Sequence, residues 1–276
     1  MDAPARPRPF VRSRRSTVVL ALAVAALAVA CVAPTPPVPD VDVTFGTDGF
    51  VAAGPGDFGF SFAARSGGGL VVAVSGGTDL GLVAYDEDGH LDTTFGTGGR
   101  ASIDLGKPAQ ARAVAVQSDG RIVVGGAIDR TTCGLGGCNN DHGIALARFT
   151  ASGDPDPTFG VGGSTSAFSY VGFNAVSNVA VQPGLGILAL LYGGQLVRFR
   201  DDGAVDARVV DQFGTVVHPG FGPASDGFAE TIGGPGSAGG GLEVLADGSI
   251  LATRRSATSS LPHLTADGSL ESSFGT

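Results

Sequence analysis

One short signature recurs along this chain and constrains its fold more than any other feature. It reads Asp-x-x-Phe-Gly and occurs three times in full, once as a degraded copy, and once with Glu in place of Asp. Successive signature phenylalanines lie 50, 64, 54 and 61 residues apart. Self-similarity at such a period indicates stacked structural units. The signature residues are Asp42, Phe45, Gly46; Asp92, Phe95, Gly96; Asp156, Phe159, Gly160; Phe213, Gly214; and Phe274, Gly275.

Two further blocks repeat in the same phase. One is an alternating apolar segment, a turn and a second apolar segment, and the other is an apolar segment that ends in an Asp-Gly or Ser-Gly turn. Such turns supply the positive φ of a tight hairpin, and the flanking segments have the length of strands. We expect the signature Phe and Gly to pin the crossing from one sheet to the next. The first block occupies 64–74, 113–126, 179–190 and 242–252, and the second 82–89, 145–153, 196–203 and 263–268.

These patterns predict an all-β fold. Each unit supplies about four antiparallel strands, and because one small sheet cannot bury both of its faces, the copies must stack. We predict a β-propeller-like array of four four-stranded meander repeats, a small or incomplete ring, within a repeat domain at 40–276. The repeats span approximately 42–91, 92–155, 156–206 and 207–276.

The three blocks, in this order and phase, resemble the bacterial delta-60 repeat. The resemblance covers about residues 40–276 and is strongest in the second repeat, where all three blocks are intact. It implies a propeller-like fold on an exported or cell-surface protein, and it implies no defined enzymatic activity. The chain departs from the pattern at the degraded copy near Phe213, and four repeats are few for this architecture.

The amino terminus has the pattern of an export signal. Arginines at 12, 14 and 15 precede an unbroken apolar run, 18–30, which is shorter than a membrane span needs. Small residues at 28 and 30 form an Ala-x-Ala site, so residues 1–30 are predicted to be a signal peptide.

Cys31 would then be the first mature residue and a candidate for lipidation. Leu27 lies one place early for a bacterial lipobox, so plain secretion and an uncleaved anchor stay open as alternatives. The Pro-rich segment 31–39 has the composition of an extended tether. A chain with three cysteines also leaves Cys31 unpaired if the other two join.

Charge limits the partners. Without residues 1–30 the chain keeps 12 of its 17 basic and 25 of its 26 acidic residues, a net charge of −13. Such a domain repels phosphate backbones, so nucleic acid is not an expected partner. Membrane contact is expected only through the lipid anchor.

Cys133 and Cys138 lie in an insertion at 129–141 and are predicted to form a disulfide outside the cytoplasm. A metal site of these cysteines with Asp141 and His142 is the weaker alternative. The acidic run 86–92 favours a solvated turn over a calcium loop. We therefore predict no metal site and no cofactor.

No motif marks a catalytic centre, and the four histidines are dispersed in sequence. The first hypothesis is an exported, non-catalytic module that binds an unidentified protein or polysaccharide through its insertions, 129–141 and about 219–241. The alternatives are a structural envelope lipoprotein and an extracellular polysaccharide hydrolase or lyase. Arg148, Arg198 and Arg200 could line one rim, but hydrogen bonding to neighbouring carbonyls or to the Asp of their own repeat is the preferred interpretation.

Overall fold

A computed structural model describes most of the repeat region. The described residues are 42–51, 58–134, 137–167, 175–192, 194–207, 209–210, 216–218, 220–222, 238–255, 261–271 and 273–274. Cys31, Phe213, Gly214 and Gly275 lie outside them. Residues from Asp42 onward belong to one compact unit. No helix in the described ranges is long and apolar enough to cross a membrane.

The first two sheets each contain four antiparallel strands in chain order. They are formed by β1 (Phe58–Ala64), β2 (Leu70–Gly76), β3 (Asp79–Tyr85) and β4 (Arg100–Asp104), then β5 (Ala109–Val116), β6 (Ile122–Gly134), β7 (Gly137–Phe149) and β8 (Ser164–Ala167).

The next two sheets contain three strands each among the described residues. They are formed by β9 (Val176–Gln182), β10 (Gly186–Leu191) and β11 (Leu196–Phe199), then β14 (Ala238–Val244), β15 (Ile250–Arg255) and β16 (His263–Leu264). A small hairpin, β12 (Val209–Val210) and β13 (Val216–His218), lies between them in the sequence. The predicted all-β meander array is confirmed, although these two sheets show three strands where four were expected.

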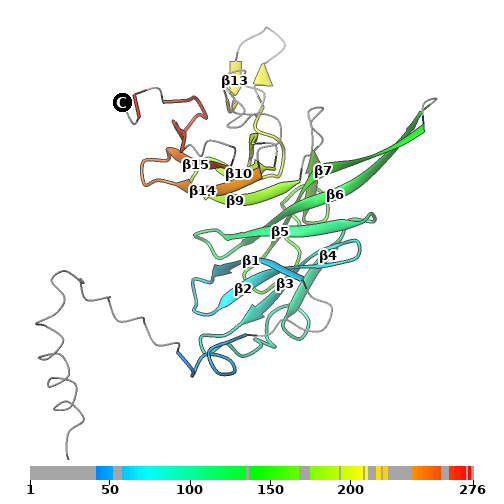
Figure 1. The fold of residues 1–276 in the computed structure, drawn as a ribbon, viewed down its shortest axis with the longest axis vertical. Coiled ribbons are helices and arrows are strands. Elements are labelled where there is room, and N and C mark those ends of the chain that lie inside the picture. The colour runs from blue at the N-terminus through cyan, green and yellow to red at the C-terminus, as the bar shows by residue number, and fades with distance from the viewer. Residues whose placement is uncertain are drawn as a thin grey trace, which may run out of the picture. The chain divides into compact units, whose positions relative to one another are not determined.

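The sheets stack face to face in an open row (Figure 1). Strand β5 packs against β1, β2 and β3, strand β9 packs against β5 and β6, and strand β14 packs against β9 and β10. Alternate residues of one strand therefore enter different cores: Ile122 and Val124 of β6 face the first sheet, whereas Val123 joins the core shared with the third sheet. Small Ala and Val side chains predominate because both faces of each middle sheet are covered.

The sequence repeat and the sheet are offset by one strand. Strand β4 follows the second signature but pairs with β3 of the first repeat, and β8 follows the third signature but pairs with β7 of the second. The second and third signatures therefore lie between the third and fourth strands of a sheet. The signature was predicted at the crossing from one sheet to the next, but the chain passes from the first sheet to the second between β4 and β5. The second and third signatures contact the next sheet through a hydrogen bond instead.

A backbone hydrogen bond joins the signature glycine to the turn that closes its own repeat. The N–H of Gly96 donates to Ser152 O at 2.7 Å, and that of Gly160 donates to Asp202 O at 2.8 Å. The N–H of Gly46 donates to Asp88 O in the same way. Because the bond uses only main-chain atoms, it repeats wherever the backbone follows the same path.

The fourth copy of this bond corrects the sequence assignment. The N–H of Gly222 donates to Asp267 O, and the N–H of Phe221 donates to Asp206 O. The place of the signature is thus taken by Asp206, Phe221 and Gly222, while Phe213 and Gly214 lie outside the described residues. Fourteen residues, including β12 and β13, separate Asp206 from Phe221 where the other signatures have two.

The insertion in the second repeat is a continuation of two strands and not a loop. Strands β6 and β7 pair in unbroken register from Ile122–Phe149 out to Gly134–Gly137. Figure 1 shows this green hairpin projecting beyond the other strands.

Two glycines of the third signature test the importance of the close approach between Gly160 and the backbone of Ser164. Gly160 and Gly162 both have positive φ, at 58° and 61°. A Cβ on Gly160 would lie 2.0 Å from Ser164 O, whereas one on Gly162 would meet nothing within 4 Å. We expect Gly160→Ala to lower the free energy of unfolding by about 3 kcal/mol or more and Gly162→Ala by only about 1 kcal/mol. Urea denaturation of both variants measures this, and equal losses would show that the close approach is unimportant.

Candidate functional site

An arginine covers the signature phenylalanine at three sheet boundaries. The guanidinium carbon of Arg148 lies 4.7 Å from the centre of the Phe159 ring, and its Nε donates to Asp156 at 2.7 Å. Both ionic side chains are almost fully buried. Arg198 makes the same contacts with Phe221 and Asp206. Arg198 thus bonds to the Asp of its own repeat and, through Nη1, to the carbonyl of Ala266, as interpreted from the sequence, whereas Arg148 bonds to Asp156 at the start of the following repeat.

At the boundary of the first and second sheets, the arginine of this arrangement comes from a different position in the repeat. Ala84 is structurally equivalent to Arg148, because its carbonyl accepts the N–H of Asp92 as the carbonyl of Arg148 accepts that of Asp156. Arg65, just after β1, supplies the cation, donating to Asp92 at 2.6 Å and lying 5.3 Å from the Phe95 ring. Three boundaries therefore share one cation–carboxylate–phenylalanine cluster.

Histidine replaces arginine in the last repeat. His263 Nδ1 lies 2.7 Å from Glu271, and its ring centre lies 4.8 Å from that of Phe274. His263 Nε2 also lies 2.9 Å from Ser249 Oγ, an order of groups found in serine hydrolases. Ser249, however, is only 6% exposed, and its hydroxyl donates to Asp247 at 2.6 Å. This constellation is the last repeat's version of the structural cluster.

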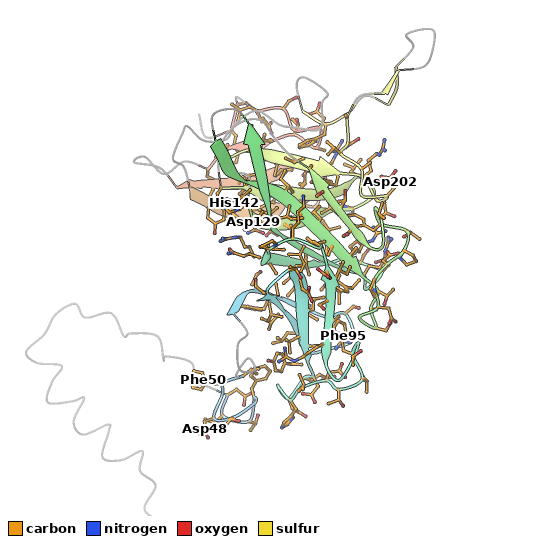
Figure 2. The ribbon with its side chains drawn as sticks, turned by 90° about the vertical axis from the view of Figure 1, so that its right-hand side faces the viewer. Asp48, Phe50, Phe95, Asp129, His142 and Asp202 are labelled. Carbon is orange, nitrogen blue, oxygen red and sulfur yellow. The ribbon has the colours of Figure 1, made fainter. Side chains whose placement is uncertain are left out.

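A polar cleft of about 480 Å³ lies between the second and third sheets, above the Arg148 cluster. Three turns form it: 117–121 between β5 and β6, 182–186 between β9 and β10, and the closing turn that follows β11. Its charged groups are Asp119, Arg121, Arg200 and Asp201, and its apolar wall includes Val181, Pro183 and Leu185. Figure 2 shows Asp202, the neighbour of Asp201, at the outer edge of the molecule.

Hydrogen bonds fix the charged side chains of the cleft. Arg121 Nε donates to Asp119 at 2.6 Å, and Arg121 Nη2 donates to Asp201 at 3.2 Å. Arg148 Nη1 reaches the same Asp201 carboxylate from below, at 2.6 Å. Burial acts to raise the pKa of Asp119, but hydrogen bonds from Arg121 outweigh it and lower that pKa. Burial likewise acts to lower the pKa of Arg121, but Asp119 and Asp201 raise it further above neutrality.

Similar hollows occur at the neighbouring boundaries with different linings. The hollow between the third and fourth sheets, about 340 Å³, is lined mainly by apolar residues such as Val181, Leu185 and Val244. Another, of about 400 Å³, lies between the first sheet and the closing turn of the second repeat, where Ser102 donates to Asp79. That hollow also contains both signs of charge, in Asp79, Arg100 and Asp154, whereas the hollow of the second and third sheets contains two arginines and two aspartates.

The predicted cysteine pair lies at the tip of the long hairpin. The backbone register places Cys133 opposite Cys138, and their side chains lie outside the described residues. Nearer the sheet, His142 Nδ1 and Asp129 lie 2.8 Å apart across the hairpin, and Figure 2 shows the two side by side. His142 therefore has a carboxylate neighbour of its own, and the disulfide stays a prediction.

The acidic run of the first repeat brings Asp86, Asp88 and His90 together on an exposed turn. Asp86 Oδ1 accepts the N–H groups of Asp88 and His90, at 3.0 and 2.8 Å. The carboxylate therefore shapes the turn, as the sequence interpretation expected. Arg200, the third of the predicted rim arginines, donates to the neighbouring Asp202 at 3.3 Å and lines the polar cleft.

The Asp156 carboxylate makes the stability of the second boundary depend on pH. Burial acts to raise its pKa, but hydrogen bonds from Thr158 and the charge of Arg148 outweigh burial and lower it. A lowered native pKa contributes stability that is present above the unfolded value and lost as the pH falls through the native value. We expect Asp156→Asn to lower the free energy of unfolding by about 2–3 kcal/mol at pH 7, a difference that shrinks below about pH 4.

Chemical denaturation of wild type and variant from pH 7 to pH 2 measures this difference. Exposed Asp154 is the matched control, and Asp154→Asn should change stability by less than about 0.5 kcal/mol. An Asp156→Asn difference that stayed constant across the range would contradict the assignment.

Comparison with known proteins finds a family that part of the chain resembles. Residues 117–159 match a family described as a domain of unknown function (DUF5122), a β-propeller. No curated protein matches the chain. A solved protein of unknown function from Bacteroides caccae is 12% identical, with a TM-score of 0.38, over 79% of this chain and 81% of that one. A catalytically inactive virginiamycin B lyase from Staphylococcus aureus, solved with quinupristin, is 11% identical, with a TM-score of 0.32, over 78% and 72%. Residues 117–159 are thus similar to a β-propeller family.

Proposed function

We propose that this chain is an exported, non-catalytic binding module of the delta-60 repeat type, and that the cleft between its second and third sheets is the recognition site. One observation carries the proposal: two arginines and two aspartates from two separate turns converge on one hollow, and a third turn supplies its apolar wall. Turns on a rigid β scaffold are where binding residues concentrate. A volume of about 480 Å³ is within the usual range of ligand sites.

The cleft is supported from below by residues that cannot move freely. Arg148 is fully buried and joins Asp156 on one side and Asp201 on the other. The Asp201 carboxylate, 64% exposed, thus presents its open side to solvent while its position is fixed from within. Such preorganisation lowers the entropy that a ligand loses on binding.

An extracellular polysaccharide or protein is the proposed partner. The net charge of −13 that remains beyond residue 30 disfavours nucleic acid. Processing at Ala30 and lipidation of Cys31 would tether the module to a membrane through the Pro-rich segment 31–39. A purely structural envelope lipoprotein, the alternative, would not need the charged cleft.

The proposed disulfide agrees with the hairpin geometry. Residues directly opposite in an antiparallel pair have Cα atoms about 4.5–5.5 Å apart, within the range that disulfides span. The register of Cys133 with Cys138 meets this condition, and an exported hairpin would be oxidised.

Filling the cleft tests the binding site. Ser118 is an exposed residue of its lining, and Val161 is 86% exposed outside that lining. We expect a panel of soluble neutral and acidic polysaccharides to contain one that raises the Tm of wild type and of Val161→Trp but not of Ser118→Trp. A ligand that shifts all three proteins equally would place the site elsewhere, and no shift with any polysaccharide would leave a protein as the proposed partner.

Lipidation is tested at Cys31. We expect Cys31→Ser to abolish fatty-acid labelling and membrane fractionation in a bacterial host, because the thioether-forming side chain is lost. Cys133→Ser is the control and should label as wild type does. Membrane fractionation that survives in Cys31→Ser would show that the segment 18–30 stays attached as an anchor.

A further inference from the structure

Gln182 and Gln117 occupy the same place in successive repeats. Gln117 stands at the start of the turn between β5 and β6, and Gln182 stands at the start of the turn between β9 and β10. Gln182 is 1% exposed and fully engaged. Its Nε2 donates to Gly248 O at 2.7 Å and to Ala266 O at 2.9 Å, and its Oε1 accepts from Arg198 Nη1 at 3.1 Å. That amide is therefore locked across the boundary between the third and fourth sheets.

Gln117 lacks the corresponding bond at its oxygen. Its Oε1 is buried and has no hydrogen-bond partner among the described residues. Arg148, the equivalent of Arg198, directs its Nη1 to Asp201 instead, and Arg121 also approaches that carboxylate. A buried acceptor without a hydrogen bond destabilises the folded chain. Because the amide oxygen of Gln117 has no bond to any described residue, the amide can turn toward the cleft that it lines.

The charges of the cleft are balanced. Arg121 and Arg200 face it together with Asp119 and Asp201. An anion would meet both carboxylates, and a cation would meet both guanidinium groups. A neutral ligand rich in hydroxyl groups suits both signs, because each hydroxyl can donate to a carboxylate or an amide oxygen and accept from an arginine.

The apolar wall fits the same chemistry. Leu185 is 45% exposed and lies with Pro183 on the turn between β9 and β10, opposite the turn that carries Gln117. A sugar ring presents C–H groups on its faces and hydroxyls at its edge, so it can contact an apolar wall and a polar rim together.

We propose that the cleft binds a neutral sugar unit of a polysaccharide, with Gln117 accepting a hydroxyl hydrogen of that sugar at its free amide oxygen. This inference rests on the proposed binding function of the cleft. It adds the ligand class and assigns a binding role to Gln117. The equivalent residue of the third repeat, Gln182, has a structural role because its amide is fully hydrogen-bonded.

Calorimetric titration of the mature full-length chain with neutral and acidic oligosaccharides of equal length tests the inference. The neutral probes are maltopentaose, cellopentaose and xylopentaose, and the acidic probe is pentagalacturonate. We expect at least one neutral probe to bind. Gln117→Met should weaken that binding about fivefold to tenfold, the loss expected for one hydrogen bond, and Ser118→Trp should abolish it.

Gln182→Met is the matched control for structure. It should lower Tm, because three hydrogen bonds are lost, whereas Gln117→Met should leave Tm unchanged or raise it. A fall in Tm for Gln117→Met as large as that for Gln182→Met would overturn the binding role assigned to Gln117.

The remaining outcomes separate this inference from the proposed function. Pentagalacturonate binding that is lost in Ser118→Trp would overturn the neutral-sugar inference and keep the cleft as a binding site. Neutral-sugar binding that survives in both Ser118→Trp and Gln117→Met would overturn both. Failure of all four probes would overturn the inference, while the polysaccharide panel decides the binding function separately.

Discussion

The row of sheets depends on one main-chain hydrogen bond, donated by a signature glycine to the carbonyl of the next closing turn. It recurs from Gly46, Gly96, Gly160 and Gly222. The bond brings the two turns into close contact, since a Cβ on Gly203 of the closing turn would lie 2.9 Å from Gly160 N, and the donating glycines have positive φ. The buried signature phenylalanine packs against the glycine of the closing turn. A Cβ on Gly153 would lie 2.9 Å from Phe95, and one on Gly268 would lie 2.6 Å from Phe221. Stacking and backbone geometry therefore support each other at one place in every repeat.

A buried guanidinium is costly unless all of its donors are satisfied, and each boundary solves this differently. Arg198 uses Asp206, Gln182 and a backbone carbonyl. Arg148 uses Asp156, Thr158 and Asp201. Arg148 Nη1 donates to Asp201, whereas Arg198 Nη1 donates to Gln182. This difference brings an exposed carboxylate to the boundary of the second and third sheets. It also leaves the amide oxygen of Gln117 without a bond in the described part of the chain. The polar cleft arises from the way in which one buried arginine is satisfied.

The sequence predicted what local pattern controls and missed what depends on distance in space. Asp-Gly turns and alternating apolar residues located the hairpins, and the spacing of Phe95 and Phe159 located the buried signatures. The fourth signature was missed because a search for Asp-x-x-Phe cannot recognise Asp206 and Phe221 when fourteen residues separate them. The cleft was missed because its lining comes from turns near residues 117, 183 and 201, which belong to different repeat blocks far apart in the sequence. Only the stacking of the second sheet on the third brings them together.

Main-chain atoms join the sheets and exposed side chains line the clefts, and this separation explains how such a chain can acquire a binding site in one repeat. The bonds that join the sheets involve main-chain atoms and a small set of buried residues, so the exposed residues of the turns can vary without disturbing them. The hollow between the third and fourth sheets shows the same geometry with an apolar lining, and there Gln182 stays locked. The two neighbouring boundaries thus share a scaffold and differ in the chemistry of their turns. Specificity can therefore change one boundary at a time, and at the boundary of the second and third sheets the turns bring together two arginines, two aspartates and a glutamine whose amide oxygen has no bond to any described residue.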